Sequence, residues 1–299
     1  MKAMMSGGTG FVGKHLAARL DTPILLGRNP ARIQREMQGV EARQWDLGRP
    51  LDPAVFSGVD TVFHLAGESV FKGRWNAEKK DRILRSRVEG TKNLVTALGQ
   101  TPNPPATLLC ASAIGYYGSR GAEMLNESSP AGNDFLATVC KSWEEEARKA
   151  EEFGIRVVSL RIGVVLGADG GALPQMLLPF KLGLGGRLGS GDQYMSWIHI
   201  DDLVSLMLHA AGDKNIKGPI NAVTPNPVTN REFTAQLAAA LHRPALLPVP
   251  GFALKIALGE FAEVLLSSQR VLPETALLSG FHFAHPVLRN ALADILSSR

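Results

Sequence analysis

A glycine-rich turn at residues 6–13 carries the residue types and the spacing of a phosphate-binding loop. It follows the apolar run 3–5 and leads into a segment, 14–20, with the composition of a helix. A strand, a glycine turn and a helix in this order are the context in which a dinucleotide fingerprint is informative. Gly7 permits the tight turn, and Gly13 lets the helix pack close to the strand.

The first backbone N–H groups of a helix are unpaired, and the helix dipole also favours an anion there. We therefore expect the turn to hold the pyrophosphate of a dinucleotide through the residues at its tip, namely Gly7, Thr9, Gly10, Phe11 and Val12. The spacing is G-x-x-G-x-x-G rather than the G-x-G-x-x-G of many dehydrogenases. The alternative is an ordinary strand-to-helix turn.

The residue that follows the second apolar run, 23–27, is an arginine, Arg28. In dinucleotide-binding folds an Asp or Glu at this position bonds the ribose 2′-hydroxyl of NAD, whereas the 2′-phosphate of NADP needs a cation. Asp21 lies too early in the chain to serve, and a guanidinium can bind a phosphate through two hydrogen bonds. The sequence therefore predicts NADP as the cofactor, with a solvated arginine at a strand end as the alternative.

The next two expected strands also end in residues that could line a cofactor. Asp46 follows the third strand, 42–45, and could face the adenine, although a turn or cap carboxylate is an equal alternative. The buried run 59–67 closes on three residues that we expect at the ligand-binding carboxyl edge of the sheet, namely Leu65, Ala66 and Gly67.

Hydroxyl groups follow the fifth expected strand, 106–111. Ser112 stands at its carboxyl end, and Tyr116 and Tyr117 come shortly after. A carbonyl that accepts hydride develops negative charge on its oxygen, so a hydrogen-bond donor must lie within reach. We expect Ser112 to bind the substrate oxygen and Tyr116, or else Tyr117, to supply the proton. A Tyr pair that only packs this loop is the alternative.

Two histidines and an aspartate are expected to be structural rather than catalytic. His64 lies inside the buried run 59–67, which favours a packed core side chain. His199 and Asp201 end the short apolar segment 197–200, and Asp201 is a good N-cap for a helix over 202–211.

Apolar runs that alternate with helical segments predict a parallel sheet. Further helices are expected over 76–99 and about 133–152, and further strands over 156–167 and 218–224. We predict an α/β fold, a Rossmann-type doubly wound parallel sheet with a smaller C-terminal substrate lobe. The NADP-binding domain would comprise residues 1–165 and 197–224, and the lobe would comprise 166–196 and 225–299.

Composition excludes several classes of protein. A net charge of +4 without a nucleic-acid motif argues against a nucleic-acid partner. The longest apolar stretch, 252–266, is too short and too charged to span a membrane. Cys110 and Cys140 show no metal-site spacing, so we expect no metal and a reducing compartment, the cytoplasm. A small molecule is the expected partner, and the sequence leaves open whether the chain forms a homodimer.

Motifs spread over nearly the whole chain resemble a known family. GGTGFVG at 7–13, HLAG at 64–67, SAIGYYG at 112–118 and WIHIDDL at 197–203 resemble the extended short-chain dehydrogenase/reductases. A narrower set resembles the sugar-epimerase-like branch known simply as epimerase family proteins: GRW at 73–75, SRVEGT at 86–91, LRIGVVLG at 160–167, LPFKLGLGG at 178–186, VLP at 271–273 and GFHF at 280–283.

The resemblance implies a Rossmann-type core, NADP binding and a substrate lobe built by the C-terminal segment. Extended members carry Tyr-x-x-x-Lys on the helix after the Ser strand, and here Lys141 matches the lysine but Ala137 stands at the tyrosine position. In the usual arrangement the lysine lowers the tyrosine pKa and holds the ribose. Lys141 is therefore expected to bind a ribose hydroxyl, or to acidify Tyr116 if the 113–118 loop folds back over the cofactor.

Two further positions depend on the same resemblance. Ser112 matches the family's Ser/Thr if Tyr116 is the tyrosine of its VYG-like motif, whereas Ala113 falls there if Tyr117 is. Arg87 stands where many relatives have Asn, and we expect it to contact the cofactor. The alternative for Arg87 is a partly buried cation paired with Glu89 or a neighbouring carboxylate.

Two classes of function fit this sequence. The first is an NADP-dependent oxidoreductase or epimerase that acts on an unidentified carbonyl or hydroxyl compound, including nucleotide-sugar-like ones. Its proton donor would be Tyr116, Tyr117, Glu68 or a bound water. The second is an NADPH-binding sensor or regulatory protein without chemistry, which the missing tyrosine favours.

Overall fold

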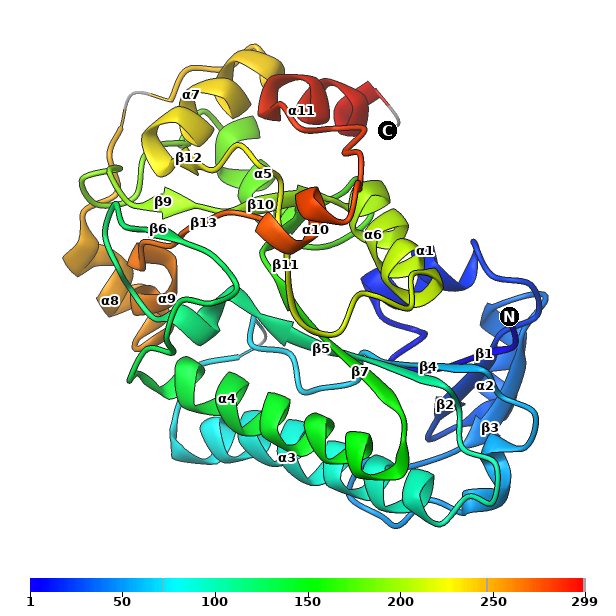
Figure 1. Cartoon of the computed structure of the whole chain (residues 1–299). Helices are drawn as coiled ribbons and strands as arrows, with labels where there is room; N and C mark the ends of the chain where they lie inside the picture. Colours follow the sequence, from blue (N-terminus) through cyan, green and yellow to red (C-terminus); the bar gives the residue numbers. More distant parts are fainter. Residues whose placement is uncertain (72, 246, 298–299) are drawn as a thin grey trace.

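A seven-stranded parallel sheet runs through the middle of the molecule (Figure 1). The computed structural model describes residues 1–71, 73–245 and 247–297. The strand order is β11-β7-β5-β4-β1-β2-β3, so the chain winds outward from β1 in both directions. That order confirms the predicted Rossmann-type doubly wound fold. The strands are β1 (Ala3–Ser6), β2 (Ile24–Gly27), β3 (Glu41–Gln44), β4 (Thr61–His64), β5 (Thr107–Ala113), β7 (Arg156–Ile162) and β11 (Gly218–Ala222).

Helices cover both faces of this sheet, because successive side chains of a strand point to opposite sides. In β1, Ala3 and Met5 enter one apolar core, whereas Met4 enters the other. The first core lies under α1 (Phe11–Ala17), α2 (Pro30–Glu36) and α6 (Ile200–Gly212). The second lies under α3 (Ala77–Gly99) and α4 (Phe135–Arg148), which run side by side in Figure 1.

Several predicted elements differ in their bounds from those of the structure. The expected strand 156–167 breaks at Gly163, where a Cβ would lie 2.6 Å from the carbonyl oxygen of Ser196. Beyond this close approach the chain leaves the main sheet as β8 (Val164–Leu166) and pairs with β10 (Trp197–His199).

The helix expected over about 133–152 begins later and ends earlier. Asp134 caps α4 by accepting the Ala137 N–H at 2.8 Å, and the chain tightens into a 3₁₀ turn, Lys149–Phe153, after Arg148. The N-cap of α6 was also predicted wrongly. His199 rather than Asp201 caps it, because its Nδ1 accepts the backbone N–H of Asp201 at 3.1 Å.

The remaining strands and α-helices lie toward the carboxyl ends of the sheet strands (Figure 1). Two short ladders join distant segments: β9 (Tyr194–Met195) with β12 (Val228–Thr229), and β6 (Met124–Leu125) with β13 (Arg270–Val271). The other helices are α5 (Leu173–Lys181), α7 (Asn230–Leu241), α8 (Gly251–Leu258), α9 (Phe261–Leu266), α10 (Glu274–Leu278) and α11 (Leu288–Ser297), with 3₁₀ turns at Pro53–Phe56 and Ile114–Tyr117. Within the described ranges, no helix is both long and apolar enough to cross a bilayer.

Candidate functional site

The glycine turn between β1 and α1 is packed too tightly for side chains. Gly7 has φ +74°, and a Cβ there would lie 2.8 Å from the backbone nitrogen of Ala66. A Cβ on Gly13 would lie 2.3 Å from the carbonyl oxygen of Gly7. Glycine is therefore required at both positions, and the turn rests directly on the chain that leaves β4.

A cavity of about 580 Å³ opens beside this turn. Its walls come from the carboxyl ends of β1, β2 and β4, from the turn after β3, and from one side of α3. It brings together eight of the residues predicted to bind a cofactor: Gly7, Thr9, Gly10, Arg28, Asp46, Leu65, Ala66 and Gly67. A region lined by the backbone of a glycine turn, with an arginine at the end of β2, suits a dinucleotide.

The cavity lining does not include Phe11, Val12, Arg87 or Lys141. The Phe11 ring packs on the loop after β8 instead, since a Cβ on Gly170 would lie 2.3 Å from it. The ring also meets His15 edge-on, with 5.2 Å between ring centroids.

Arg87 joins α3 to the chain after β4 through hydrogen bonds. Its Nη1 donates to the carbonyl oxygens of Glu68 at 3.0 Å and Ile83 at 3.1 Å. Its guanidinium lies over the ring of Trp143 at 5.0 Å, and burial lowers its pKa from the ordinary value. The alternative pairing of Arg87 with Glu89 is not made, because Glu89 accepts from Arg85 at 3.0 Å.

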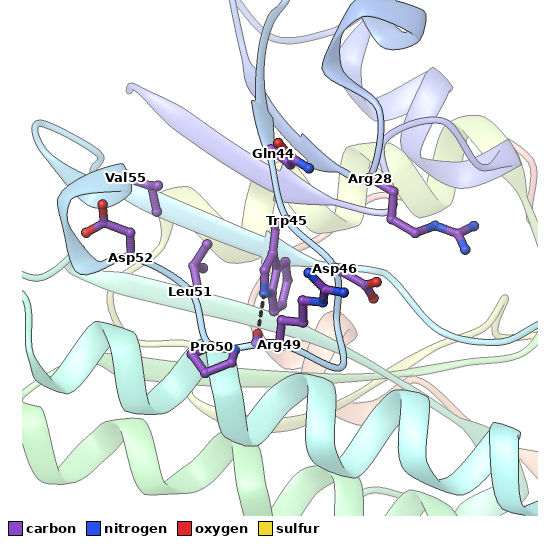
Figure 2. Close-up of a pocket in the computed structure, with 9 residues that line it drawn as sticks. All are labelled: Arg28, Gln44, Trp45, Asp46, Arg49, Pro50, Leu51, Asp52 and Val55. Atoms are coloured by element: carbon purple, nitrogen blue, oxygen red, sulfur yellow. Dashed lines mark hydrogen bonds between the residues drawn. The ribbon is translucent and has the colours of Figure 1, made fainter.

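A second cavity, of about 490 Å³, adjoins the first and shares Arg28, Trp45 and Asp46 with it (Figure 2). Both cavities contain the end of β2 and the turn after β3. Asp46 faces both, and its Oδ1 accepts the Gly48 N–H at 3.3 Å, so it also serves its own turn.

Ser112, the second-last residue of β5, lies beside a buried ion pair. Its hydroxyl donates to Oε1 of Glu144, on α4, at 2.6 Å. Arg161, on β7, donates to both oxygens of the same carboxylate, each at 2.9 Å. Burial alone would lower the pKa of Arg161, but the bonds and charge of Glu144 raise it, so the guanidinium is a fixed cation.

The two tyrosines after β5 meet this cation in different ways. Tyr116 lies face-on to the Arg161 guanidinium, 3.5 Å from it. Tyr117 is fully buried, and its hydroxyl accepts from Arg161 at 3.0 Å and donates to Asn221 at 2.7 Å. Burial raises the pKa of Tyr117 to about 12, so this hydroxyl is a poor proton donor.

Lys141 is exposed on α4, and no hydrogen bond or ion pair ties its amine to another described residue. Ala137, four residues earlier, is fully buried. The residues that contact Ser112 and the tyrosines are instead Glu144 and Arg161.

Sequence reasoning missed Glu144, Arg161 and Asn221. One signal was available for Arg161, because a charged residue inside the apolar run 156–167 must find a buried partner. Nothing comparable marked Glu144, which stands in the acidic run 144–146.

Glu68, a predicted alternative donor, lines the first cavity. Its Oε1 accepts from the buried Lys79 at 2.5 Å, and this hydrogen bond holds the pKa of the carboxyl below its usual range. Its backbone N–H donates to Ser86 at 2.9 Å. An ionised, paired carboxylate is better placed to anchor this loop than to donate a proton.

Both histidines predicted to be structural have structural contacts. The buried His64 meets the Ser6 hydroxyl through Nδ1 at 2.7 Å and the Thr91 hydroxyl through Nε2 at 3.0 Å. Burial lowers the pKa of His64 to about 4, so the ring is neutral at pH 7. Burial also lowers the pKa of His199, which caps α6.

His199, Asp201 and His285 are the described residues whose ligand atoms lie close enough together to hold a metal ion. The His199 Nδ1 is already occupied by the Asp201 N–H. The two rings are stacked, with 3.9 Å between centroids and 26° between planes, so their in-plane lone pairs do not converge on one point. We therefore interpret His199 as the N-cap of α6 and His285 as its stacking partner, and not as metal ligands.

Comparison with known proteins places this geometry in a family. Residues 3–222 match the model of the NAD dependent epimerase/dehydratase family, and residues 249–295 match a domain of unknown function, DUF1731. Epimerase family protein YfhF of Bacillus subtilis is 38% identical over 304 residues, which cover 100% of this chain and 99% of that protein. Mouse epimerase family protein SDR39U1 is 37% identical, over 99% of this chain and 100% of that protein.

Among solved structures, human epimerase family protein SDR39U1 (isoform 2) with NADPH superposes with a TM-score of 0.89. It is 34% identical, and the match covers 100% of both chains. UDP-glucuronic acid 4-epimerase from Bacillus cereus, at 18% identity and a TM-score of 0.78, shares the fold. With this coverage, the chain belongs to the NAD dependent epimerase/dehydratase family, in company with the epimerase family proteins.

Proposed function

We propose that this chain is an NADP(H)-dependent oxidoreductase or epimerase that acts on a small carbonyl or hydroxyl compound. The observation that carries the proposal is the cavity of about 580 Å³, which joins the glycine turn to an arginine at the end of β2. A Cβ at Gly7 or Gly13 would collide with backbone, so the turn is built for close packing, and it brings Gly10, the N-cap of α1, to the cavity wall. The residues present fit a dinucleotide.

NADP rather than NAD is supported by the charge at the end of β2. Arg28 is exposed there, and none of its guanidinium nitrogens bonds another described residue. An acidic side chain at this position, which would favour NAD, is missing from the sequence. The crystal structure of human SDR39U1 with NADPH, a relative over the full length, supports the same choice.

NADP(H), when bound, would donate or accept a hydride. The chain must then supply a hydrogen-bond donor and a proton at the substrate oxygen. We propose Ser112 for the first task and Tyr116 for the second, at the carboxyl edge of β5. The Ser112 hydrogen is committed to Glu144 at 2.6 Å, so Ser112 can serve a substrate only if this bond is exchanged on binding. Tyr116 lies face-on to the Arg161 guanidinium, which is 3.5 Å from its ring centroid, so the ring is held at this edge of the sheet.

A second candidate function is that of an NADPH-binding sensor that catalyses no reaction. Two residues of α4 support it. Lys141 is exposed and unpaired among the described residues, and a buried Ala137 stands where extended members carry the catalytic tyrosine. We propose that this tyrosine is missing here. The cytoplasm fits either candidate, because both cysteines are buried and free.

The discriminating experiment is a screen of carbonyl and nucleotide-sugar compounds with two readouts. Loss of NADPH absorbance detects an oxidoreductase, and chromatography of the compounds after incubation with NADP(H) detects an epimerase, which regenerates its cofactor. Oxidation of NADPH by any compound, abolished by heat denaturation of the protein, eliminates the sensor. Tight NADPH binding without turnover of any compound supports the sensor and contradicts the enzyme.

A further inference from the structure

Two arginines near the end of β2 have no side-chain partner among residues 1–71, 73–245 and 247–297. Arg28, after β2, and Arg49, in the turn after β3, line the same cavity of about 490 Å³. Neither guanidinium makes a hydrogen bond or an ion pair within the described part of the chain. Nearby arginines differ, since Arg43 donates to Glu41 and Arg32 donates to Glu36, each at 2.7 Å. Two arginines that are bonded to no carboxylate are free to bind an anion.

The acids of this cavity are already engaged by backbone. Asp46 accepts the Gly48 N–H at 3.3 Å, and Asp52 accepts the Ala54 N–H at 2.9 Å. Figure 2 shows Arg28, Asp46 and Arg49 gathered at one end of the cavity and Asp52 at the other. The two guanidiniums therefore meet solvent at the end that adjoins the larger cavity.

The turn holds Arg49 in a defined place. Its backbone N–H donates to the Asp46 carbonyl oxygen at 2.8 Å, and its carbonyl oxygen accepts from the indole of the buried Trp45 at 3.1 Å. From α3, Asn93 donates to the Leu47 carbonyl oxygen at 2.8 Å. These three bonds fix the backbone of the turn from which the Arg49 side chain extends.

We propose that Arg49 and Arg28 together bind the 2′-phosphate of NADP(H), and that Arg49 is a second determinant of cofactor specificity. The inference rests on the proposed function, since it deepens the NADP(H) site. The two cavities share Arg28, Trp45 and Asp46, so a phosphate on the ribose reaches the smaller cavity from the larger one. A phosphate monoester has three terminal oxygens and can accept from two guanidiniums at once.

Fluorescence titration of the full chain with NADPH and NADH tests the proposal, with 2′,5′-ADP and 5′-ADP as fragment probes in calorimetry. Arg49→Ala is expected to lower the affinity for NADPH and for 2′,5′-ADP about tenfold. The affinities for NADH and 5′-ADP should stay within about twofold of wild type. Arg49→Lys should recover part of the lost NADPH affinity, because lysine keeps the positive charge but lacks the planar guanidinium that donates two hydrogen bonds to one phosphate. Arg35→Ala, on the exposed last turn of α2 and outside both cavities, is the charge-matched control.

The possible outcomes distinguish the role proposed for Arg49 from the NADP(H) site proposed around Arg28. If Arg28→Ala lowers NADPH affinity selectively and Arg49→Ala changes neither nucleotide, Arg49 is not a ligand and the NADP(H) site stands. Equal losses for NADPH and NADH in Arg49→Ala would show that the turn has collapsed rather than that a phosphate contact is gone. Wild-type protein that binds both nucleotides equally overturns both proposals. Thermal unfolding of each variant without ligand checks that the fold is intact.

Discussion

Ser112 at the end of β5 and Glu144 in the middle of α4 are joined by a 2.6 Å hydrogen bond in which the serine hydroxyl donates. The same carboxylate takes two bonds from Arg161, whose side chain is 4% exposed. One carboxylate thus fixes both the residue proposed to meet the substrate oxygen and the cation under Tyr116. Its removal affects stability and chemistry together.

Glu144→Ala should lower the free energy of unfolding by about 3 kcal/mol, because it leaves Arg161 buried and unpaired. Urea unfolding measures this loss. Glu145→Ala changes an exposed acid of the same helix and should stay within about 0.5 kcal/mol of wild type. Equal stability of the two variants would mean that Arg161 finds another partner.

Once a substrate is found, Ser112→Ala and Tyr116→Phe should each reduce turnover more than they change NADPH affinity. Ser112→Ala removes the proposed donor to the substrate oxygen, and Tyr116→Phe removes the proposed proton source. Tyr117→Phe is the comparison, since its hydroxyl is buried against Asn221. Wild-type turnover in Tyr116→Phe would assign Tyr116 to packing.

The sheet and the glycine turn could be predicted from sequence because their signals are local. Apolar runs mark the strands, and Gly7 and Gly13 stand where only glycine fits. The ion pair between Glu144 and Arg161 could not be predicted, because it joins a helix to a strand and depends on how the two pack in the folded chain. The cap of α6 was predicted wrongly because Asp is a preferred N-cap residue and histidine is not. In the structure His199, whose ring stacks on His285, accepts the Asp201 N–H.

The stability of the fold should fall in acid through His64. The pKa of His64 is lowered to about 4 in the folded chain from an ordinary value of 6.5. Between these two pH values the ring is protonated in the unfolded chain but neutral in the folded chain. The contribution is fully present above pH 6.5 and is lost as the pH falls toward 4. Urea unfolding should show that wild type loses about 2 kcal/mol more between pH 6.5 and 4.5 than His64→Gln does. Parallel losses in the two proteins would show that His64 titrates normally.

Gly7→Ala should weaken NADPH binding more than about tenfold, because the new Cβ forces the turn away from Ala66 and displaces the proposed pyrophosphate site. Gly212→Ala is the control, since nothing lies within 4 Å of a Cβ there. Calorimetry with NADPH gives both affinities. Unchanged affinity in Gly7→Ala would place the cofactor elsewhere.

The central claim is that this chain binds NADP(H) at the glycine turn and distinguishes it from NAD(H) through Arg28. Parallel fluorescence titrations of wild type and Arg28→Ala with NADPH and NADH test it most directly. Charge-assisted hydrogen bonds to the phosphate predict that wild type prefers NADPH by about ten- to a hundredfold, and that Arg28→Ala loses most of this preference while NADH affinity barely changes. Equal affinities of wild type for the two nucleotides, or an equal loss for both in Arg28→Ala, would contradict it.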